Sequence, residues 1–289
     1  MTPSMTPHST TPDSTASRRP AIDGARVLDP VEFHHTGMTS FFASQTDQRF
    51  SYCLYVPTAH HDETRRLPLV VVMHGTQRSA ERYRTMFAEF AEEHECVVVA
   101  PLFPAGIAEE GDLHGFKRIL RHGIRYDTVL LDIVDQVQAR WRVDGSRFLL
   151  HGFSGGGQFA HRFAYLHPDR LSALSIGAPG RITRIDPATP WWLGTADVPE
   201  LFGVELDLPA LRQVPVQMIV GAEDTATWEI AEPGIDAGGD TRVERLTTLR
   251  DNWTGHGIGV RFDLIAGMAH SGSTAIPHAQ RFFADVLAG

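Results

Sequence analysis

The sequence predicts a single α/β domain in which a mostly parallel central sheet carries helices on both faces. Apolar runs of strand length alternate with segments of helical periodicity, the pattern of parallel strands joined by right-handed helical crossovers. The chain has 289 residues, of which 42% are hydrophobic and 21% charged, ordinary values for a globular protein. A chain of this length buries enough surface to hold a core without disulfides or a metal.

The N-terminal segment is predicted to lie outside this domain. Residues 1–24 are rich in Thr, Ser and Pro, and such a segment cannot bury enough apolar surface to offset the entropy of ordering it. We therefore expect a disordered tail over residues 1–24 and the α/β domain over residues 25–289. No apolar stretch follows Arg18 and Arg19, so an export signal is not expected.

The first two strands are predicted at residues 41–42 and 50–56, paired near an edge of the sheet. Residues 67–74 (LPLVVVMH) form a continuous apolar run, which is typical of a strand covered on both faces. The later strands are predicted at residues 96–100, 147–153, 171–176, 214–220 and 260–265. The helices are predicted at residues 79–93, 126–141, 155–167 and 275–287, where apolar residues recur at helical spacing.

Two long segments interrupt the alternation, residues 101–123 and residues 181–213. Segments of this length in a compact domain are usually functional, and we expect residues 181–213 to form a lid-like insertion. This insertion contains aromatic side chains that could wall an apolar substrate pocket. The predicted pocket residues are Trp191, Trp192, Phe202 and, past the last but one strand, Trp228. The alternative is that these rings pack on the domain.

Composition also excludes several functions. A formal net charge of -9 argues against a nucleic-acid binder, which needs a basic surface. No run approaches the 18 apolar residues of a membrane span. Cys53 and Cys96 stand in apolar runs and are expected to be buried free thiols, compatible with a cytoplasmic protein. The histidines show no metal-ligand spacing, so neither a metal nor a cofactor is expected.

The sharpest motif is Gly152-Phe153-Ser154-Gly155-Gly156, a G-x-S-x-G between a predicted strand and a predicted helix. A tight strand-to-helix turn strains the backbone of the serine, and glycines at positions −2 and +2 avoid clashes. Such a turn raises the serine Oγ above the carboxyl edge of the sheet, where ligands bind. Ser154 is therefore the candidate nucleophile.

The same glycines allow a competing interpretation as a dinucleotide-binding loop. Gly155, Gly157 and Ala160 fit G-x-G-x-x-A after a strand. However, this strand is not the first of the α/β region, and no acidic residue ends the following strand. The serine interpretation is favoured.

Further residues follow in an order that supports acyl-transfer chemistry. The turn His74-Gly75-Thr76 can offer the Thr76 amide to a developing oxyanion, with the Gly155 amide as the second donor. His74 itself is expected to brace this turn.

The acid and the base are expected after two later strands. Asp224, or its neighbour Glu223, follows residues 214–220, and we favour Asp224. His270 follows the last strand and would act as the base, oriented by the carboxylate.

The order Ser154, Asp224, His270 after a His-Gly turn resembles the α/β-hydrolase superfamily. Within it, the motif and the following Gln158-Phe159-Ala160-His161 are similar to polyhydroxyalkanoate-depolymerase-like and feruloyl-esterase-like serine esterases. The resemblance covers residues 41–289 and implies a single α/β-hydrolase domain. Secreted depolymerases of this kind usually carry a signal peptide and extra cysteines, neither of which is expected here, and this departure counts against a polymer substrate.

The expected function is hydrolysis of a small or medium carboxylic ester through an acyl-enzyme on Ser154. The same triad can also cleave amide or carbon–carbon bonds, and the same scaffold can carry a lyase. An amidase or peptidase, a carbon–carbon hydrolase and a lyase are therefore alternative activities. A non-catalytic ligand-binding relative is a further alternative, which the presence of all three triad residues disfavours. The expected partner is a small-molecule ester or amide, and the oligomeric state is left open.

Overall fold

The computed structural model describes residues 35–289, so the predicted tail over residues 1–24 lies outside the described residues. Within residues 35–289 the central sheet has nine strands. Its order is β1 (Gly37–Met38), β3 (Ser51–Val56), β5 (Val97–Leu102), β4 (Leu67–Met73), β8 (Val143–Phe153), β9 (Leu171–Gly177), β10 (Val216–Gly221) and β11 (Val260–Ile265), and β2 (Phe42–Ala43) pairs with β3.

From β5 to β11 every neighbouring pair of strands is parallel, and β3 runs antiparallel to β5 at the other end of the sheet. The central strands are buried on both faces; in β4 all but one residue is buried. In β4 and β5 the continuous apolar sequence leaves no polar face for water, which is why helices cover both sides. The predicted fold class, an α/β domain with a mostly parallel sheet, is confirmed.

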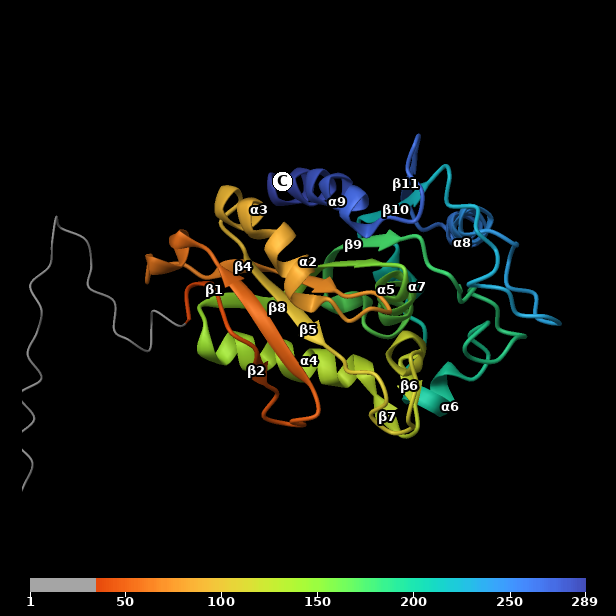
Figure 1. Ribbon diagram of the computed structural model, residues 1–289, viewed down its shortest axis with the longest axis horizontal. Coiled ribbons are helices and arrows are strands. Elements are labelled where there is room, and N and C mark those ends of the chain that lie inside the picture. Colours follow the sequence, from red (N-terminus) through yellow and green to blue (C-terminus); the bar gives the residue numbers. More distant parts are fainter. Residues whose placement is uncertain (1–34) are drawn as a thin grey trace, which may run out of the picture.

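The helices lie on the two faces of the sheet, with α9 and α3 on one side and α4 on the other (Figure 1). Their bounds are α2 (Ala80–Met86), α3 (Ala88–Glu93), α4 (Tyr126–Arg140), α5 (Gly155–Leu166), α6 (Val198–Phe202), α7 (Leu208–Leu211), α8 (Arg242–Gly255) and α9 (Gly272–Leu287). Short 3-10 turns occupy Thr58–His61 (η1), Gly115–Arg118 (η2) and Pro168–Arg170 (η3), and β6 (Leu120–Arg121) pairs with β7 (Ile124–Arg125).

Several elements differ from the sequence prediction. The helix expected over residues 79–93 is two helices, because Phe87 leaves helical geometry with φ −96° and ψ 4° while its ring is fully buried. Strand β5 continues through Pro101, which lies beyond the last residue paired with β4 and is paired with Tyr52 of β3. Helix α8 was not predicted.

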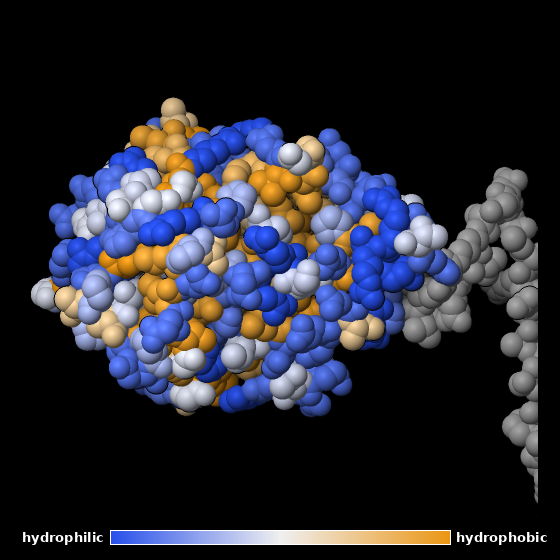
Figure 2. Space-filling view, turned by 180° about the vertical axis from the view of Figure 1, so that it is seen from behind, coloured by the Kyte–Doolittle hydropathy of each residue, from blue (hydrophilic) through white to orange (hydrophobic). Residues whose placement is uncertain are grey.

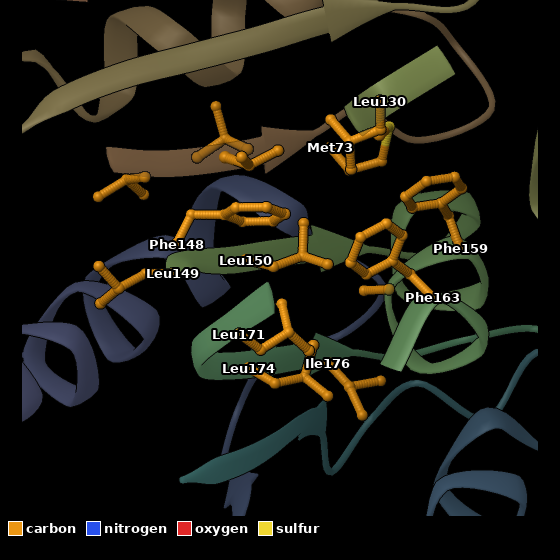
Figure 3. Packing of buried hydrophobic residues seen from close by; sticks show 14 of the residues in the cluster. Met73, Leu130, Phe148, Leu149, Leu150, Phe159, Phe163, Leu171, Leu174 and Ile176 are labelled. Atoms are coloured by element: carbon orange, nitrogen blue, oxygen red, sulfur yellow. The ribbon is translucent and has the colours of Figure 1, made fainter. Parts of the chain in front are cut away.

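The core fills the layers between the helices and the sheet. Figure 3 shows side chains of β8 and β9, among them Leu150 and Ile176, beside Phe159 and Phe163 of α5. The outer surface mixes hydrophilic residues with scattered hydrophobic patches on the face drawn in Figure 2. None of the helices formed by residues 35–289 is long and apolar enough to cross a membrane.

Candidate active site

Ser154 occupies the turn between β8 and α5 with φ 56° and ψ −113°. A positive φ is costly for a residue with a Cβ atom, so this turn is strained. The Ser154 amide donates to the Gly177 carbonyl at 2.8 Å, and the Ser154 carbonyl accepts from the Gln158 amide at 3.0 Å. These two bonds hold the serine between the sheet and the first turn of α5.

The glycines at positions −2 and +2 are sterically required. A Cβ atom on Gly152 would lie 2.3 Å from the Gly156 carbonyl oxygen, and one on Gly156 would lie 2.5 Å from the Met73 carbonyl oxygen. Neither neighbour is a flexible side chain, so a methyl group at either position would force the backbone apart. The close approach explains why the motif carries glycine there.

The turn after β4 places the Thr76 amide beside α5. An ideal Cβ on Gly155 would lie 3.1 Å from the Thr76 nitrogen, so the two backbones are nearly in contact. Within residues 35–289 neither the Thr76 nor the Gly155 amide has a hydrogen-bond acceptor. Two free amides at this spacing can receive a developing oxyanion.

His74 braces this turn. Its Nδ1 lies 2.8 Å from the Gly75 carbonyl oxygen, and its Nε2 accepts from the Phe103 amide at 3.0 Å. The ring is completely buried, and burial lowers its pKa to about 4. A neutral ring with the proton on Nδ1 satisfies both hydrogen bonds. His74 therefore links the end of β4 to Phe103, the residue that follows β5.

Asp224 and His270 meet at the carboxyl ends of β10 and β11. The His270 Nδ1 lies 2.6 Å from Asp224 Oδ2, and Asp224 is 1% exposed whereas Glu223 is exposed. Of the two carboxylates left open by the sequence, only Asp224 reaches the histidine. Because the carboxylate accepts a hydrogen bond from Nδ1–H, the His270 Nε2 is left to act as a base.

Arg242 holds the other carboxylate oxygen and was missed by sequence reasoning. Its guanidinium, on the first residue of α8, donates to Asp224 Oδ1 at 3.2 Å and to Glu229 Oε2 at 2.5 Å. Helix α8 begins with a capping box formed by Thr241 and Glu244. That T-x-x-E pattern was the available signal for the helix. No signal in the sequence pairs Arg242 with Asp224, because the contact spans 18 residues through a loop.

The candidate residues open into one cavity of about 570 Å³. Thr76, Ser154 and His270 all line it, and so does Trp228, which is 79% exposed. Its position agrees with the prediction that Trp228 walls the pocket. No three His, Cys, Asp or Glu side chains gather as a metal site in the described part of the chain.

The other three predicted pocket residues lie elsewhere, which corrects the prediction. Trp191, Trp192 and Phe202 do not line the cavity. The Trp191 ring packs against Phe202 with ring centroids 4.9 Å apart, and its Nε1 donates to the Arg118 carbonyl at 2.9 Å. The Trp192 ring lies 5.3 Å from the Arg162 guanidinium. These contacts attach the 181–213 segment to the domain, with Phe202 buried and the two tryptophans half-buried.

A parallel sheet in this order, with a strained serine after β8 and the Asp224–His270 pair after β10 and β11, is the α/β-hydrolase fold. Residues 50–182 match the family profile described as esterase PHB depolymerase. The chain is thus a carboxylic ester hydrolase with the α/β-hydrolase fold, and the resemblance drawn from the sequence is confirmed.

Solved structures support the fold. Poly(aspartic acid) hydrolase-1 from Sphingomonas sp. KT-1 is 22% identical, with a TM-score of 0.71 over 85% of this chain and 98% of that chain. A poly(3-hydroxybutyrate) depolymerase from Bordetella parapertussis is 23% identical, with a TM-score of 0.71 over 88% and 92%. An S-formylglutathione hydrolase from Agrobacterium tumefaciens is 18% identical, with a TM-score of 0.60 over 86% and 93%. A search of curated proteins found no match to the sequence.

Proposed function

We propose that this esterase hydrolyses a carboxylic ester of a small or medium organic substrate through an acyl-enzyme on Ser154. The observation that carries the proposal is the Asp224–His270 pair, with 2.6 Å between Oδ2 and Nδ1, on the same cavity as the strained Ser154. The esterase family match supports ester chemistry. A cavity of about 570 Å³ is in the size range of small-ligand sites.

In the proposed reaction, His270 Nε2 takes the proton of Ser154 Oγ as this oxygen attacks the carbonyl carbon. The Thr76 and Gly155 amides donate to the oxyanion, and Asp224 stabilises the imidazolium. His270 then gives its proton to the departing alkoxide. A water molecule then attacks the acyl carbon while His270 Nε2 takes its proton. The bond to Ser154 Oγ breaks, this oxygen receives the proton from His270, and the acid is released.

Amide hydrolysis is the second candidate, because the same triad attacks both bonds. Its support is the overall likeness to poly(aspartic acid) hydrolase-1, whose name refers to an amide-linked polymer. A carbon–carbon hydrolase and a non-catalytic binder have no supporting observation. The test compares p-nitrophenyl esters, from acetate to long acyl chains, with p-nitroanilides of the same acyl groups. The ratio of kcat/KM within each pair shows which bond type the enzyme prefers.

The test of the nucleophile combines turnover with covalent labelling. We expect a fluorophosphonate probe to label the wild-type chain at Ser154, and Ser154→Ala to lose labelling and ester hydrolysis while keeping its Tm. Ser154→Cys is the matched variant, because it keeps a nucleophile in the same turn. Undiminished hydrolysis of every active ester by Ser154→Ala would refute the proposal.

We also propose a cytoplasmic location, which rests on the two cysteines. Cys53 and Cys96 are free and buried, and burial raises their pKa to about 11 and about 12, so both are unreactive thiols. Cell fractionation of the native host tests this location.

A further inference from the structure

Lys117 is the only lysine in the 289-residue sequence; the remaining 25 of the 26 basic residues are arginines. It stands in η2, within the long segment that follows β5, and its residue is 3% exposed. Lysine is among the residue types most rarely buried to this extent without a partner. Its side chain nevertheless lines the cavity that contains Ser154.

The ammonium-bearing end of Lys117 lies next to the oxyanion amides. An ideal Cβ on Gly155 would lie 3.0 Å from Lys117 Cε and 3.1 Å from the Thr76 nitrogen. The backbone of Lys117 is held in place because its carbonyl accepts a hydrogen bond from Arg162. The Arg162 guanidinium in turn lies over the Trp192 ring, so the 181–213 segment supports the position of Lys117.

The charge on Lys117 is not neutralised by a carboxylate. The other cations on the cavity wall are paired: Arg181 with Glu232 at 2.7 Å, and Arg242 with Asp224 and Glu229. Lys117 forms no ion pair with any of residues 35–289, and its Nζ lies 3.0 Å from His114 Nδ1.

The surroundings of Lys117 disfavour its charge. Burial lowers its pKa to about 7, with Arg78 and Arg181 adding to the effect and Asp112 opposing it. Burial also lowers the pKa of His114 to about 4, so the His114 ring is neutral and can only accept from the ammonium through one lone pair. An ammonium group carries three protons, so two remain for other acceptors beside the cavity that Lys117 lines. A buried cation in this state gains most from an anion supplied by a ligand.

We infer that the cavity is built for esters whose acyl part carries a carboxylate, which Lys117 binds. This inference rests on the proposed esterase function and deepens it. The acyl part is assigned because Lys117 lies on the Gly155 side of Ser154, whereas the leaving group must face His270, which protonates it. The substrate class is therefore a half-ester of a dicarboxylic acid.

The first experiment compares anionic and neutral acyl groups on one alcohol. The anionic substrates are the monoethyl esters of succinate, glutarate and adipate, and the neutral ones are ethyl butyrate, valerate and hexanoate, with released acid measured by chromatography at pH 6.5. We expect wild type to favour the anionic member of at least one matched pair. Lys117→Met should lower that preference by about 10- to 100-fold, the equivalent of one charge-assisted hydrogen bond, and Lys117→Arg should restore part of it.

The matched control is Arg65→Met, which removes a surface cation paired with Glu95 and should leave the preference unchanged. An equal loss on neutral and anionic esters in Lys117→Met would assign Lys117 to oxyanion stabilisation and overturn the inference. A preference for anions on the alcohol side, measured with 4-acetoxybutanoate against butyl acetate, would also overturn it. Absence of Ser154-dependent hydrolysis of the neutral esters would instead count against the proposed function.

A second experiment reads binding without turnover. Because Lys117 is the only lysine, reductive methylation by formaldehyde and cyanoborohydride can be followed at this residue by peptide mass. We expect succinate to slow methylation of Lys117 in Ser154→Ala, and neutral succinamide to leave it unchanged. Equal protection by both compounds, or by neither, would contradict carboxylate binding whatever the catalytic result.

Discussion

Replacing Arg242 with methionine tests the contact that sequence reasoning missed. Arg242 is 3% exposed and Asp224 is 1% exposed, so the substitution leaves the Asp224 Oδ1 buried without its charged donor. The carboxylate keeps its contact with His270 but is free to turn about its side-chain torsions. We therefore expect a loss of both catalytic efficiency and stability.

The magnitude follows from the single bond removed. A hydrogen bond to a charged group contributes about 1.5–3 kcal/mol, so kcat/KM for a neutral ester should fall about 10- to 100-fold. This stays below the roughly 10⁴-fold loss typical of removing the triad carboxylate function itself. Breaking a buried ion pair costs about 3–5 kcal/mol, and the lower end applies because Asp224 keeps one partner. At roughly 2–4 °C per kcal/mol for a domain of this size, Tm should fall by about 6–12 °C.

The assay measures kcat and KM for p-nitrophenyl butyrate together with the Tm of each variant. Glu229→Gln is the matched control, because it removes the other partner of Arg242 from a side chain that is 43% exposed, and exposed pairs contribute about 1 kcal/mol or less. Arg242→Lys keeps the charge and should recover part of the activity. If Arg242→Met keeps kcat/KM within about twofold of wild type, Arg242 does not position Asp224, and the reasoning fails.

Two further predictions concern the buried histidine of β8 and the inserted segment. His151 is completely buried, with Nδ1 3.0 Å from Ser175 Oγ, and burial lowers its pKa to about 4. The unfolded chain therefore binds the proton first as pH falls from 6.5 to 4, and the free energy of unfolding should drop by up to roughly 3 kcal/mol from this group. Denaturant melts across that range should show a shallower pH slope for His151→Gln, and an unchanged slope would contradict the assignment. Trp191→Ala and Trp192→Ala should each destabilise the chain by about 1–3 kcal/mol without altering acyl-chain preference among neutral esters, and a changed preference would return these rings to the substrate pocket.

Local patterns were sufficient for most of the fold and for the nucleophile. The apolar runs that became β4 and β5 are continuous because both faces are covered, and this is visible in the sequence itself. The Gly152-to-Gly156 motif could also be recognised from the sequence, because its glycines avoid steric clashes within a single strand-to-helix turn. Helix α8 was missed because it is mostly polar and its few apolar residues give only a weak helical pattern. Its capping box, formed by Thr241 and Glu244, was nevertheless present in the sequence.

The sequence by itself determined an α/β domain with a strained serine and a short set of candidate partners. Only the tertiary structure decided that Asp224 rather than Glu223 meets His270, and that Trp191 and Trp192 pack on the domain. It also placed Lys117 beside Gly155. The physical reason is that strand, helix and turn signals depend on neighbours within a few residues. Burial and pairing of charges depend instead on which distant segments the sheet brings to one edge.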